Sequence, residues 1–181
     1  PCPGRLTAQG VFTDPLSPAA PCGERMQRAA LAYRAPGDWG LPETPASLPA
    51  EKGLRLADPA GDGLYLLVDL QREEAGLLHL DIALPEPARI LIGFGEHLDD
   101  LRARTSVGGR QFAAVYEARA GRQTFTHALK RAGCRYVQLH IYAHAATLYY
   151  AGVCPTVYPV DYRPAFHCAD ALHNRIFEVS R

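Results

Sequence analysis

Three acidic side chains lie close together in a polar stretch of the sequence: Glu96, Asp99 and Asp100. Two carboxyl groups held about 5–10 Å apart can hydrolyse a glycosidic bond, one as the acid and the other as the base or nucleophile. Residues this near in sequence rarely lie on opposite sides of a sugar ring, whereas Asp side chains in a turn readily accept hydrogen bonds from nearby backbone N–H groups. We therefore interpret the cluster as a solvated turn and assign no catalytic residue.

The histidines do not have the spacing of a metal site. His140 and His144 would come together on a helix, but they fall in a predicted strand, where four residues at about 3.3 Å each separate them by roughly 13 Å. The Gly-x-Gly at residues 93–95 ends a predicted strand and leads into a polar loop, so it lacks the helix N-terminus that a phosphate-binding loop needs. The sequence predicts neither a metal nor an organic cofactor.

Tyrosines form the second prominent group of side chains. Two of them share one face of a predicted strand and three more are close in sequence: Tyr136 and Tyr142, then Tyr149, Tyr150 and Tyr158. Tyrosine rings can stack on the apolar faces of sugars, so an exposed row of them would make a carbohydrate-binding surface. The same pattern fits a half-buried face that the N-terminal flank or another domain covers. We favour the covered face and keep carbohydrate binding as the alternative.

The charge balance bears on the class of partner. Lys+Arg and Asp+Glu both number 19, so no basic surplus exists to neutralise the phosphates of a nucleic acid. No apolar run approaches the roughly 18 residues of a membrane span, and no signal peptide opens the sequence. We expect neither a nucleic acid nor a membrane as partner. The sequence starts at Pro1 and stops within a helical pattern, so we expect both ends to be cuts; the compartment stays open, with the cytoplasm favoured.

The five cysteines follow no zinc or disulfide pattern. Their number is odd and none forms a C-x-x-C pair. We favour idle or buried thiols in a reducing compartment. Cys134 and Cys154 could lie on neighbouring strands, so a bridge between these two stays open.

Short β-prone segments fill the middle of the sequence. Apolar runs and alternations bounded by Gly, Pro and charged residues predict strands at 64–71, 77–85, 88–96, 111–119, 122–129, 134–144 and 146–160. We expect a turn at 72–76 and a hairpin across Ala120 and Gly121. Strands at this spacing, with almost no helix between them, predict an all-β fold: an antiparallel β-sandwich of the jelly-roll kind.

Composition divides the chain into three regions. Residues 1–60 are rich in Pro, Gly and Ala and predict an irregular N-terminal flank, with one short helix at 25–35 and a linker at 35–53. Residues 61–160 make the sandwich domain, and residues 161–181 are a junction leading into a short C-terminal helix. Asp170 is a good N-cap for that helix, and Leu172, Ile176 and Val179 recur on one face of it. A helix of about a dozen residues is marginal alone, so this face needs a partner.

Three stretches carry a family resemblance. Residues 66–82, LLVDLQREEAGLLHLDI, resemble a strand ending in Asp-Leu-Gly-Arg-Glu, with Gln71 in place of the usual Gly. Residues 92–100, IGFGEHLDD, and 109–141 resemble a Gly-Glu-x-Leu segment, a Gly-x-Gln-x-Phe turn and an Arg-Tyr-x-Gln-Leu strand. Residues 158–181 resemble a junction of Tyr-Pro-Val followed by Phe-x-Cys-x-Asp. Together they are similar to the bacterial α-L-rhamnosidase family of glycoside hydrolases, over roughly residues 60–181.

The resemblance implies an accessory β-sandwich that leads into an (α/α)₆ catalytic barrel. The implied parent enzyme removes terminal α-L-rhamnosyl residues with inversion, using two carboxylates of that barrel. None of those carboxylates maps onto this chain, so no catalytic residue is transferred to it. The C-terminal helix would pack on the barrel of the same parent chain. Without the barrel, we expect the helix to fray or to dock on a second copy in a weak homodimer.

Two functional hypotheses stay open. In the first, the chain is an accessory sandwich that is inactive alone, and a loop at 96–110 reaches toward the substrate cleft. The candidate substrate-binding residues are then Glu96, Asp99, Asp100, Arg102 and Arg110. In the second, the chain is a free-standing carbohydrate-binding module, which should expose its tyrosines. An independent hydrolase is disfavoured, because the acidic loop has no opposing partner in the sequence.

Overall fold

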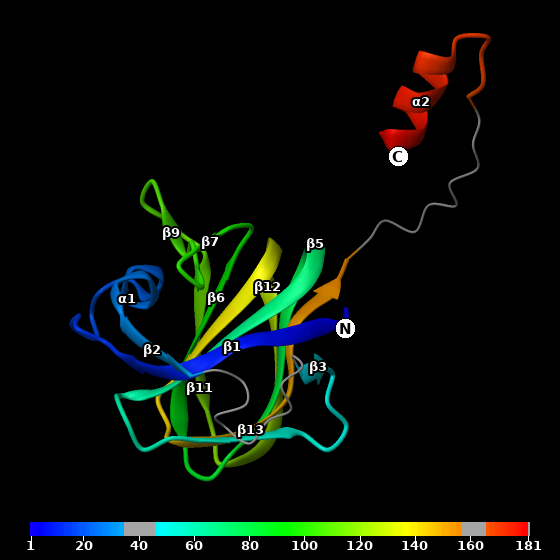
Figure 1. The fold of residues 1–181 in the computed structure, drawn as a ribbon. Coiled ribbons are helices and arrows are strands. Elements are labelled where there is room, and N and C mark those ends of the chain that lie inside the picture. The colour runs from blue at the N-terminus through cyan, green and yellow to red at the C-terminus, as the bar shows by residue number, and fades with distance from the viewer. Residues whose placement is uncertain (35–45, 157–165, 181) are drawn as a thin grey trace.

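The structure, a computed structural model, describes residues 1–34, 46–156 and 166–180. Over these residues the chain is mostly antiparallel β, with short helices α1 (Cys22–Arg28) and α2 (Ala171–Val179) (Figure 1). The longer strands are β1 (Gly4–Thr13), β5 (Gly63–Leu84), β6 (Ala88–Gly95), β11 (Ala113–Ala118), β12 (Gly121–Ile141) and β13 (Ala145–Pro155). The shorter strands are β2 (Ala30–Arg34), β3 (Ala46–Leu48), β4 (Leu54–Ala57), β7 (Leu98–Asp99), β8 (Arg102–Ala103), β9 (Ser106–Val107) and β10 (Arg110–Gln111).

One curled sheet supplies both layers of the sandwich. Its strand order is β11-β6-β12-β5-β1-β2, and β13 pairs with β4 and with the second half of β5. In the first layer, residues 64–69 of β5 pair with β1 on one side and with residues 136–141 of β12 on the other. In the second layer, residues 79–84 of β5 pair with residues 121–126 of β12 and with β13. The predicted all-β antiparallel sandwich is confirmed.

The strands β5 and β12 each run through both layers. β5 extends over 22 residues and β12 over 21, so the turn predicted at 72–76 is wrong. Gln71 has a φ of +67°, and the register of β12 against β5 shifts between Cys134 and Tyr136. These irregularities bend the strand pair instead of ending it. The side chains of residues 71–73 are exposed at the bend, which explains why the sequence there reads as a turn.

The hairpin predicted across Ala120 and Gly121 is also wrong. β11 pairs with β6, whereas the start of β12 pairs with the end of β5, so the chain changes layer at this point. Tyr116 of β11 stacks on Phe125 of β12 with ring centroids 4.4 Å apart. The two strands therefore meet through side chains at the core and not through a hydrogen-bond ladder.

Two apolar clusters lie on opposite faces of the first layer. The larger fills the space between the layers and contains fully buried side chains such as Leu66, Leu80 and Leu139. The smaller lies on the outer face and is centred on Phe12 and Tyr65. Leu31 of β2 and Leu98 of β7, among others, pack against it. This second cluster holds the N-terminal segment and the β7–β8 region against β12.

Residues 4–13 form β1 in the main sheet, which corrects the expectation of an irregular flank over residues 1–60. β1 pairs with β5, β2 and β3, and Leu6 and Phe12 are buried. The prolines that suggested irregular structure flank this strand and do not interrupt it. The helix predicted at 25–35 is α1, which starts earlier and gives way to β2. The predicted linker at 35–53 lies outside the described residues as far as residue 45.

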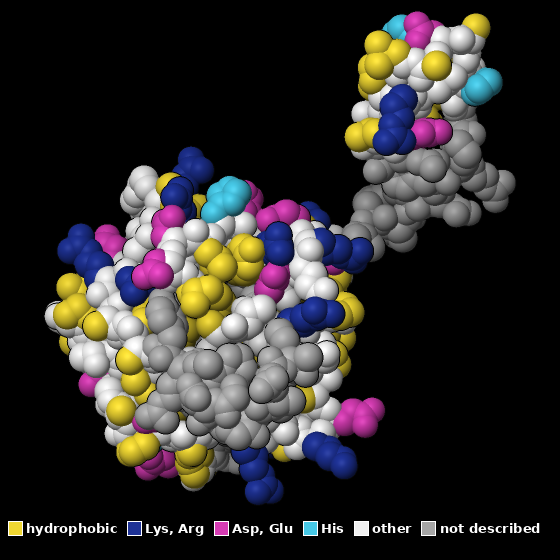
Figure 2. Space-filling model, in the orientation of Figure 1, with side chains coloured by type: hydrophobic (Ala, Val, Ile, Leu, Met, Phe, Trp, Pro, Cys, Tyr) yellow, Lys and Arg dark blue, Asp and Glu magenta, His cyan; other side chains and the backbone are white. Residues whose placement is uncertain are grey.

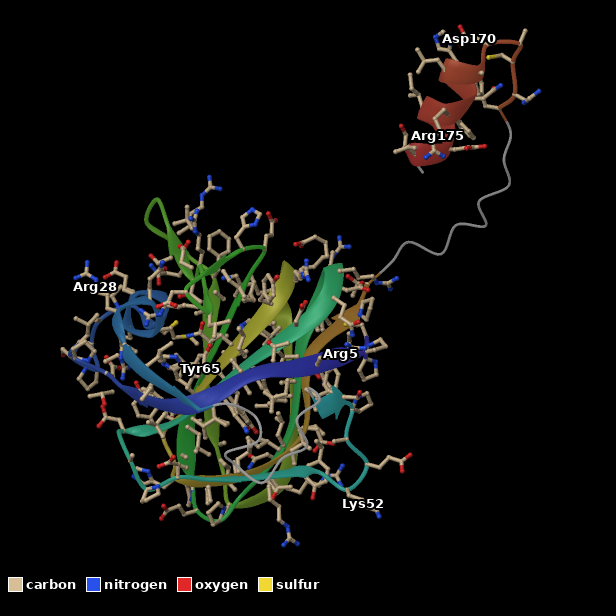
Figure 3. All side chains as sticks on the ribbon, viewed as in Figure 1. Arg5, Arg28, Lys52, Tyr65, Asp170 and Arg175 are labelled. Atoms are coloured by element: carbon tan, nitrogen blue, oxygen red, sulfur yellow. The ribbon has the colours of Figure 1, made fainter. Side chains whose placement is uncertain are left out.

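The C-terminal helix α2 forms where the sequence predicts it. Asp170 lies at the start of this helix (Figure 3). Its Oδ1 accepts hydrogen bonds from the backbone N–H groups of Leu172 and His173, at 2.8 and 3.2 Å. No residue of α2 is buried. Among the described residues, no helix has the length and apolar character to cross a membrane.

All five cysteines are free, so Cys134 and Cys154 form no bridge. Cys134 is fully buried, and burial raises the pKa of its thiol to about 12. That thiol is therefore protonated and unreactive at neutral pH.

Candidate functional site

Asp99 and Asp100 lie on a small hairpin that follows β6, and Glu96 lies between β6 and that hairpin. Leu98 of β7 pairs with Ala103 of β8, and Asp100 and Leu101 between them have φ values of +50° and +55°. Two successive residues with positive φ make the tight turn that suits a two-residue hairpin, and Asp tolerates this conformation better than most residues. Asp100 thus has the turn role that the sequence favoured.

Gln138 anchors this hairpin to the sheet. It is the Gln of the Arg-Tyr-x-Gln-Leu stretch and is fully buried, and its side-chain Oε1 accepts a hydrogen bond from the backbone N–H of Ala103 at 2.8 Å. Its Nε2 lies 2.8 Å from Nε2 of His140. Burial lowers the pKa of His140 to about 3, so this imidazole is neutral and accepts the hydrogen bond.

The hairpin and the residues after it also contact α1. Arg102 donates a hydrogen bond through Nη1 to the carbonyl oxygen of Gln27. Thr105 Oγ1 donates to the carbonyl oxygen of Gly23 at 2.7 Å, and the N–H of Ser106 donates to Gln27 Oε1 at 3.0 Å. Arg102, one of the predicted substrate-binding residues, therefore positions the loop.

Asp99 is paired with Arg104. The guanidinium donates through Nε and Nη2 to the two carboxylate oxygens, at 2.6 and 3.0 Å. These hydrogen bonds are the main reason that the pKa of Asp99 lies below its ordinary value. Asp99 is therefore an ionised carboxylate that holds Arg104, which the sequence had not singled out.

A pocket of about 250 Å³ opens beside this loop, where β6 ends next to Gly133 of β12. Its lining combines an aromatic ring, one aliphatic side chain, two glycines and three polar or charged side chains: Gly95, Glu96, His97, Arg104, Val107, Phe112 and Gly133. Figure 2 shows hydrophobic side chains gathered beside a histidine and several charged side chains on the face toward the viewer. Of the five predicted substrate-binding residues, only Glu96 lines the pocket. Asp99 does not line it but is hydrogen-bonded to Arg104, which does. The other three, Asp100, Arg102 and Arg110, do not line the pocket.

Glu73 of β5 lies close enough to Glu96 for the two charges to interact. Its pKa is raised by partial burial and then by the negative charge of Glu96, while His97 and Arg135 act in the opposite direction. The bend in β5 thus brings a carboxylate near Glu96 from a distant part of the sequence. The proximity of Glu73 to Glu96 could not be found from local spacing, although both residues lie in the stretches that carry the family resemblance.

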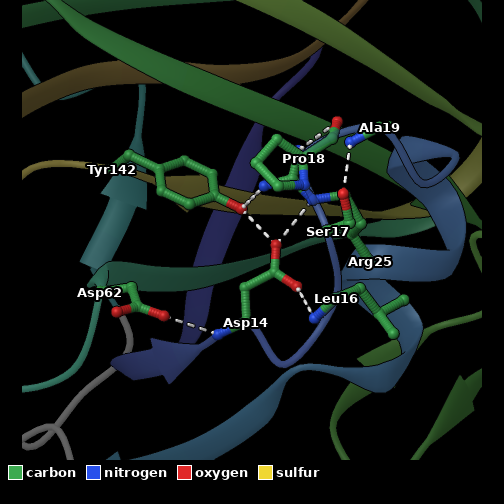
Figure 4. Close-up of polar contacts among 8 residues, drawn as sticks. All are labelled: Asp14, Leu16, Ser17, Pro18, Ala19, Arg25, Asp62 and Tyr142. Carbon is green, nitrogen blue, oxygen red and sulfur yellow. Dashed lines mark hydrogen bonds and ion pairs between the residues drawn. The ribbon is translucent and has the colours of Figure 1, made fainter.

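The predicted tyrosine face is covered. Tyr142 donates a hydrogen bond to Asp14 Oδ2 at 2.6 Å, and Arg25 donates through Nε to the same oxygen at 2.7 Å and through Nη2 to the Tyr142 hydroxyl at 2.5 Å (Figure 4). Burial alone would raise the pKa of Asp14, but the hydrogen bonds from Tyr142, the Leu16 N–H and Arg25 outweigh it and lower that pKa. The N-terminal segment therefore closes over this part of the sheet.

The other described tyrosines are not an open platform either. Arg135 lies 5.1 Å from the ring centroid of Tyr136, and Arg122 lies 3.6 Å from that of Tyr149. Tyr150 is buried, with its hydroxyl bonded to the carbonyl oxygens of Cys2 and Val153. Tyr158 lies outside the described residues. Among the described residues, no group of three or more His, Cys, Asp and Glu side chains could hold a metal ion.

Comparison with known proteins gives matches among solved structures alone. No family model and no curated protein matches the chain. It is similar to a GH78 family rhamnosidase of Bacillus sp. GL1, with a TM-score of 0.58 and 27% sequence identity over 74% of this chain. A rhamnosidase from Klebsiella oxytoca with rhamnose bound gives a TM-score of 0.36 and 13% identity over 83% of this chain. The chain spans 14% of the length of the first rhamnosidase and 28% of the second. The resemblance to the α-L-rhamnosidase family that the sequence motifs indicate is confirmed: this chain is similar in structure and sequence to a segment of a GH78 rhamnosidase.

Proposed function

We propose that this chain is an accessory β-sandwich of an α-L-rhamnosidase-like glycoside hydrolase, without catalytic activity of its own. The observation that carries the proposal is the match of 74% of this chain to only 14% of the Bacillus enzyme, at 27% identity. The parent protein would hydrolyse terminal α-L-rhamnosides, with its catalytic carboxylates outside this chain.

The helix α2 supports an accessory role. Its apolar face is exposed, with Leu172 at 65%, Ile176 at 52% and Val179 at 68% of full exposure. A short helix gains most of its stability from packing such a face. We propose that this face packs on the catalytic (α/α)₆ barrel of the parent chain and couples the sandwich to it.

Hydrolysis of a chromogenic α-L-rhamnoside tests the proposal. The 181-residue chain should release no chromophore above the buffer rate, whereas a protein extended through the following several hundred residues should be active. The accessory role would be overturned if the 181-residue chain hydrolysed the rhamnoside and lost this activity in both Glu73→Gln and Glu96→Gln. These are the two carboxylates that the fold brings near each other. Inactivity of the extended protein toward rhamnosides would overturn the proposed activity of the parent.

A further inference from the structure

The pocket at the end of β6 has the chemistry of a sugar-binding site. We propose that it binds one neutral sugar ring, and that its ligand is a 6-deoxyhexose of the L-rhamnose type. The choice of sugar rests on the proposed function, whereas the class of ligand follows from the pocket itself.

The apolar side of the pocket is held in place. Phe112 packs edge-on against Phe94, with ring centroids 5.9 Å apart. Its backbone N–H donates to the carbonyl oxygen of Thr105 at 2.8 Å, and its carbonyl oxygen accepts from the Phe94 N–H at 2.9 Å. An aromatic ring fixed in this way offers a surface for the C–H face of a sugar, and the half-exposed Val107 adds an aliphatic contact that suits a methyl group.

The polar side of the pocket offers both acceptors and donors. Glu96 supplies carboxylate oxygens that accept hydrogen bonds from hydroxyl groups, and His97 supplies ring nitrogens. Arg104 donates hydrogen bonds through Nε and Nη2 to Asp99, and its planar guanidinium carries further N–H donors. A sugar ring, which carries hydroxyl groups around an apolar face, satisfies such a mixed lining.

The charges of the pocket select against an anion. Glu96 and the neighbouring Glu73 are both acidic, and Asp99 neutralises Arg104. The like charges are close enough that Glu96 raises the pKa of Glu73. A carboxylate or phosphate ligand would meet the negative charges of Glu96 and Glu73, and the Arg104 guanidinium is already paired with Asp99, so a neutral ligand is favoured over an acidic sugar.

Gly133 gives a way to fill the pocket. A Cβ atom added there meets no heavy atom within 4 Å, and the backbone does not have the positive φ that restricts a residue to glycine. Gly133→Leu should therefore occupy the pocket without straining the sheet. Ala128→Leu is the matched control, because Ala128 is an exposed residue of the same strand that does not line the pocket.

The test is an NMR titration of the ¹⁵N-labelled 181-residue chain with methyl α-L-rhamnoside, with sodium D-glucuronate as the acidic comparison. We expect saturable shifts of the Gly95 and Gly133 amide signals with a dissociation constant of about 1 mM, a value typical of a small ligand with few contacts. Gly133→Leu and Glu96→Gln should each weaken binding about tenfold, and Ala128→Leu should not change it.

Three results would overturn the proposal: no saturable shift with the rhamnoside, binding of glucuronate at least as tight, or unchanged binding in both Gly133→Leu and Glu96→Gln. If the short chain binds the sugar but the extended protein does not hydrolyse rhamnosides, the pocket proposal stands and the proposed parent activity fails. If the extended protein is active but the short chain does not bind the sugar, only the pocket proposal fails.

Discussion

Asp69 and Arg135 join two of the stretches that carry the family resemblance. The carboxylate of Asp69 accepts hydrogen bonds from Nε and Nη2 of Arg135, at 2.9 and 3.0 Å, and Oδ1 also accepts the backbone N–H of Gln71 at 2.7 Å. The hydrogen bond from Arg135 is the main reason that the pKa of Asp69 is lowered. This pair pins the bend of β5 to the register shift in β12.

Replacing Asp69 should therefore destabilise the sandwich. We expect Asp69→Ala to lower the melting temperature by roughly 2–4 °C, as for a loss of about 1 kcal/mol in a chain of this size. Glu117→Ala is the control, because Glu117 pairs with Arg89 at the surface, where its side chain is 64% exposed. Thermal unfolding followed by circular dichroism measures both; equal shifts in the two variants would contradict a special role for Asp69.

Gln71 occupies a backbone conformation that favours glycine. Its φ of +67° is the left-handed region, which costs a residue with a Cβ atom about 1–2 kcal/mol relative to glycine. Because glycine adopts this conformation without that cost, we expect Gln71→Gly to stabilise the chain by about 1 kcal/mol.

Urea unfolding of Gln71→Gly checks this prediction. Ala75→Gly is the matched control: Ala75 is an exposed residue of the same strand with an ordinary φ, and glycine there should cost about 0.5–1 kcal/mol. A Gln71→Gly variant that is destabilised like the control would mean that the Gln71 side chain contributes more than its backbone strain costs.

His140 should make the stability depend on pH in the mildly acidic range. Its folded-state pKa of about 3 lies below the unfolded value near 6.5, so the unfolded chain binds more protons between these values. The free energy of unfolding therefore falls as the pH drops below about 6.5, by about 2 kcal/mol from this group between pH 7 and pH 5.

Urea midpoints measured at pH 7 and pH 5 test this dependence. His140→Leu should flatten the difference between the two pH values, even if it lowers stability at both by leaving the amide of Gln138 without its partner. His144→Gln, at an exposed histidine nearby, is the control for the removal of an imidazole. An undiminished pH dependence in His140→Leu would assign it to other groups, such as His79, whose pKa burial also lowers.

The apolar face of α2 should make the isolated chain self-associate weakly. Sedimentation velocity is expected to show a sedimentation coefficient that rises with concentration, and Ile176→Glu should abolish the rise by placing a charge at the centre of that face. Arg175→Glu, on the same helix outside the apolar face, is the control for an added carboxylate. A monomer at all concentrations, with residues 170–180 protected from hydrogen exchange, would contradict both fraying and docking of the helix.

The sequence allowed local features to be predicted well. The N-cap of α2, the strand-forming stretches and the turn role of Asp100 depend on residues close to one another, where propensity and spacing decide. Partners across the sheet depend on register, and no periodicity in β5 or β12 distinguishes one bent strand from two strands joined by a turn. For the same reason, Glu96 could be identified from the sequence as part of a local acidic cluster. The proximity of Glu73 to Glu96 could be seen only in the folded structure.

The continuity of β5 and β12 has a consequence for the order of folding. Their ladder runs from Leu84 and Gly121 at one end to Leu64 and Ile141 at the other. The first pair closes the shorter loop, so chain entropy favours starting the ladder there and extending it toward the second pair. The layer that contains β13 should then assemble first. The other layer should form when the β5–β12 ladder extends past the bend at Gln71.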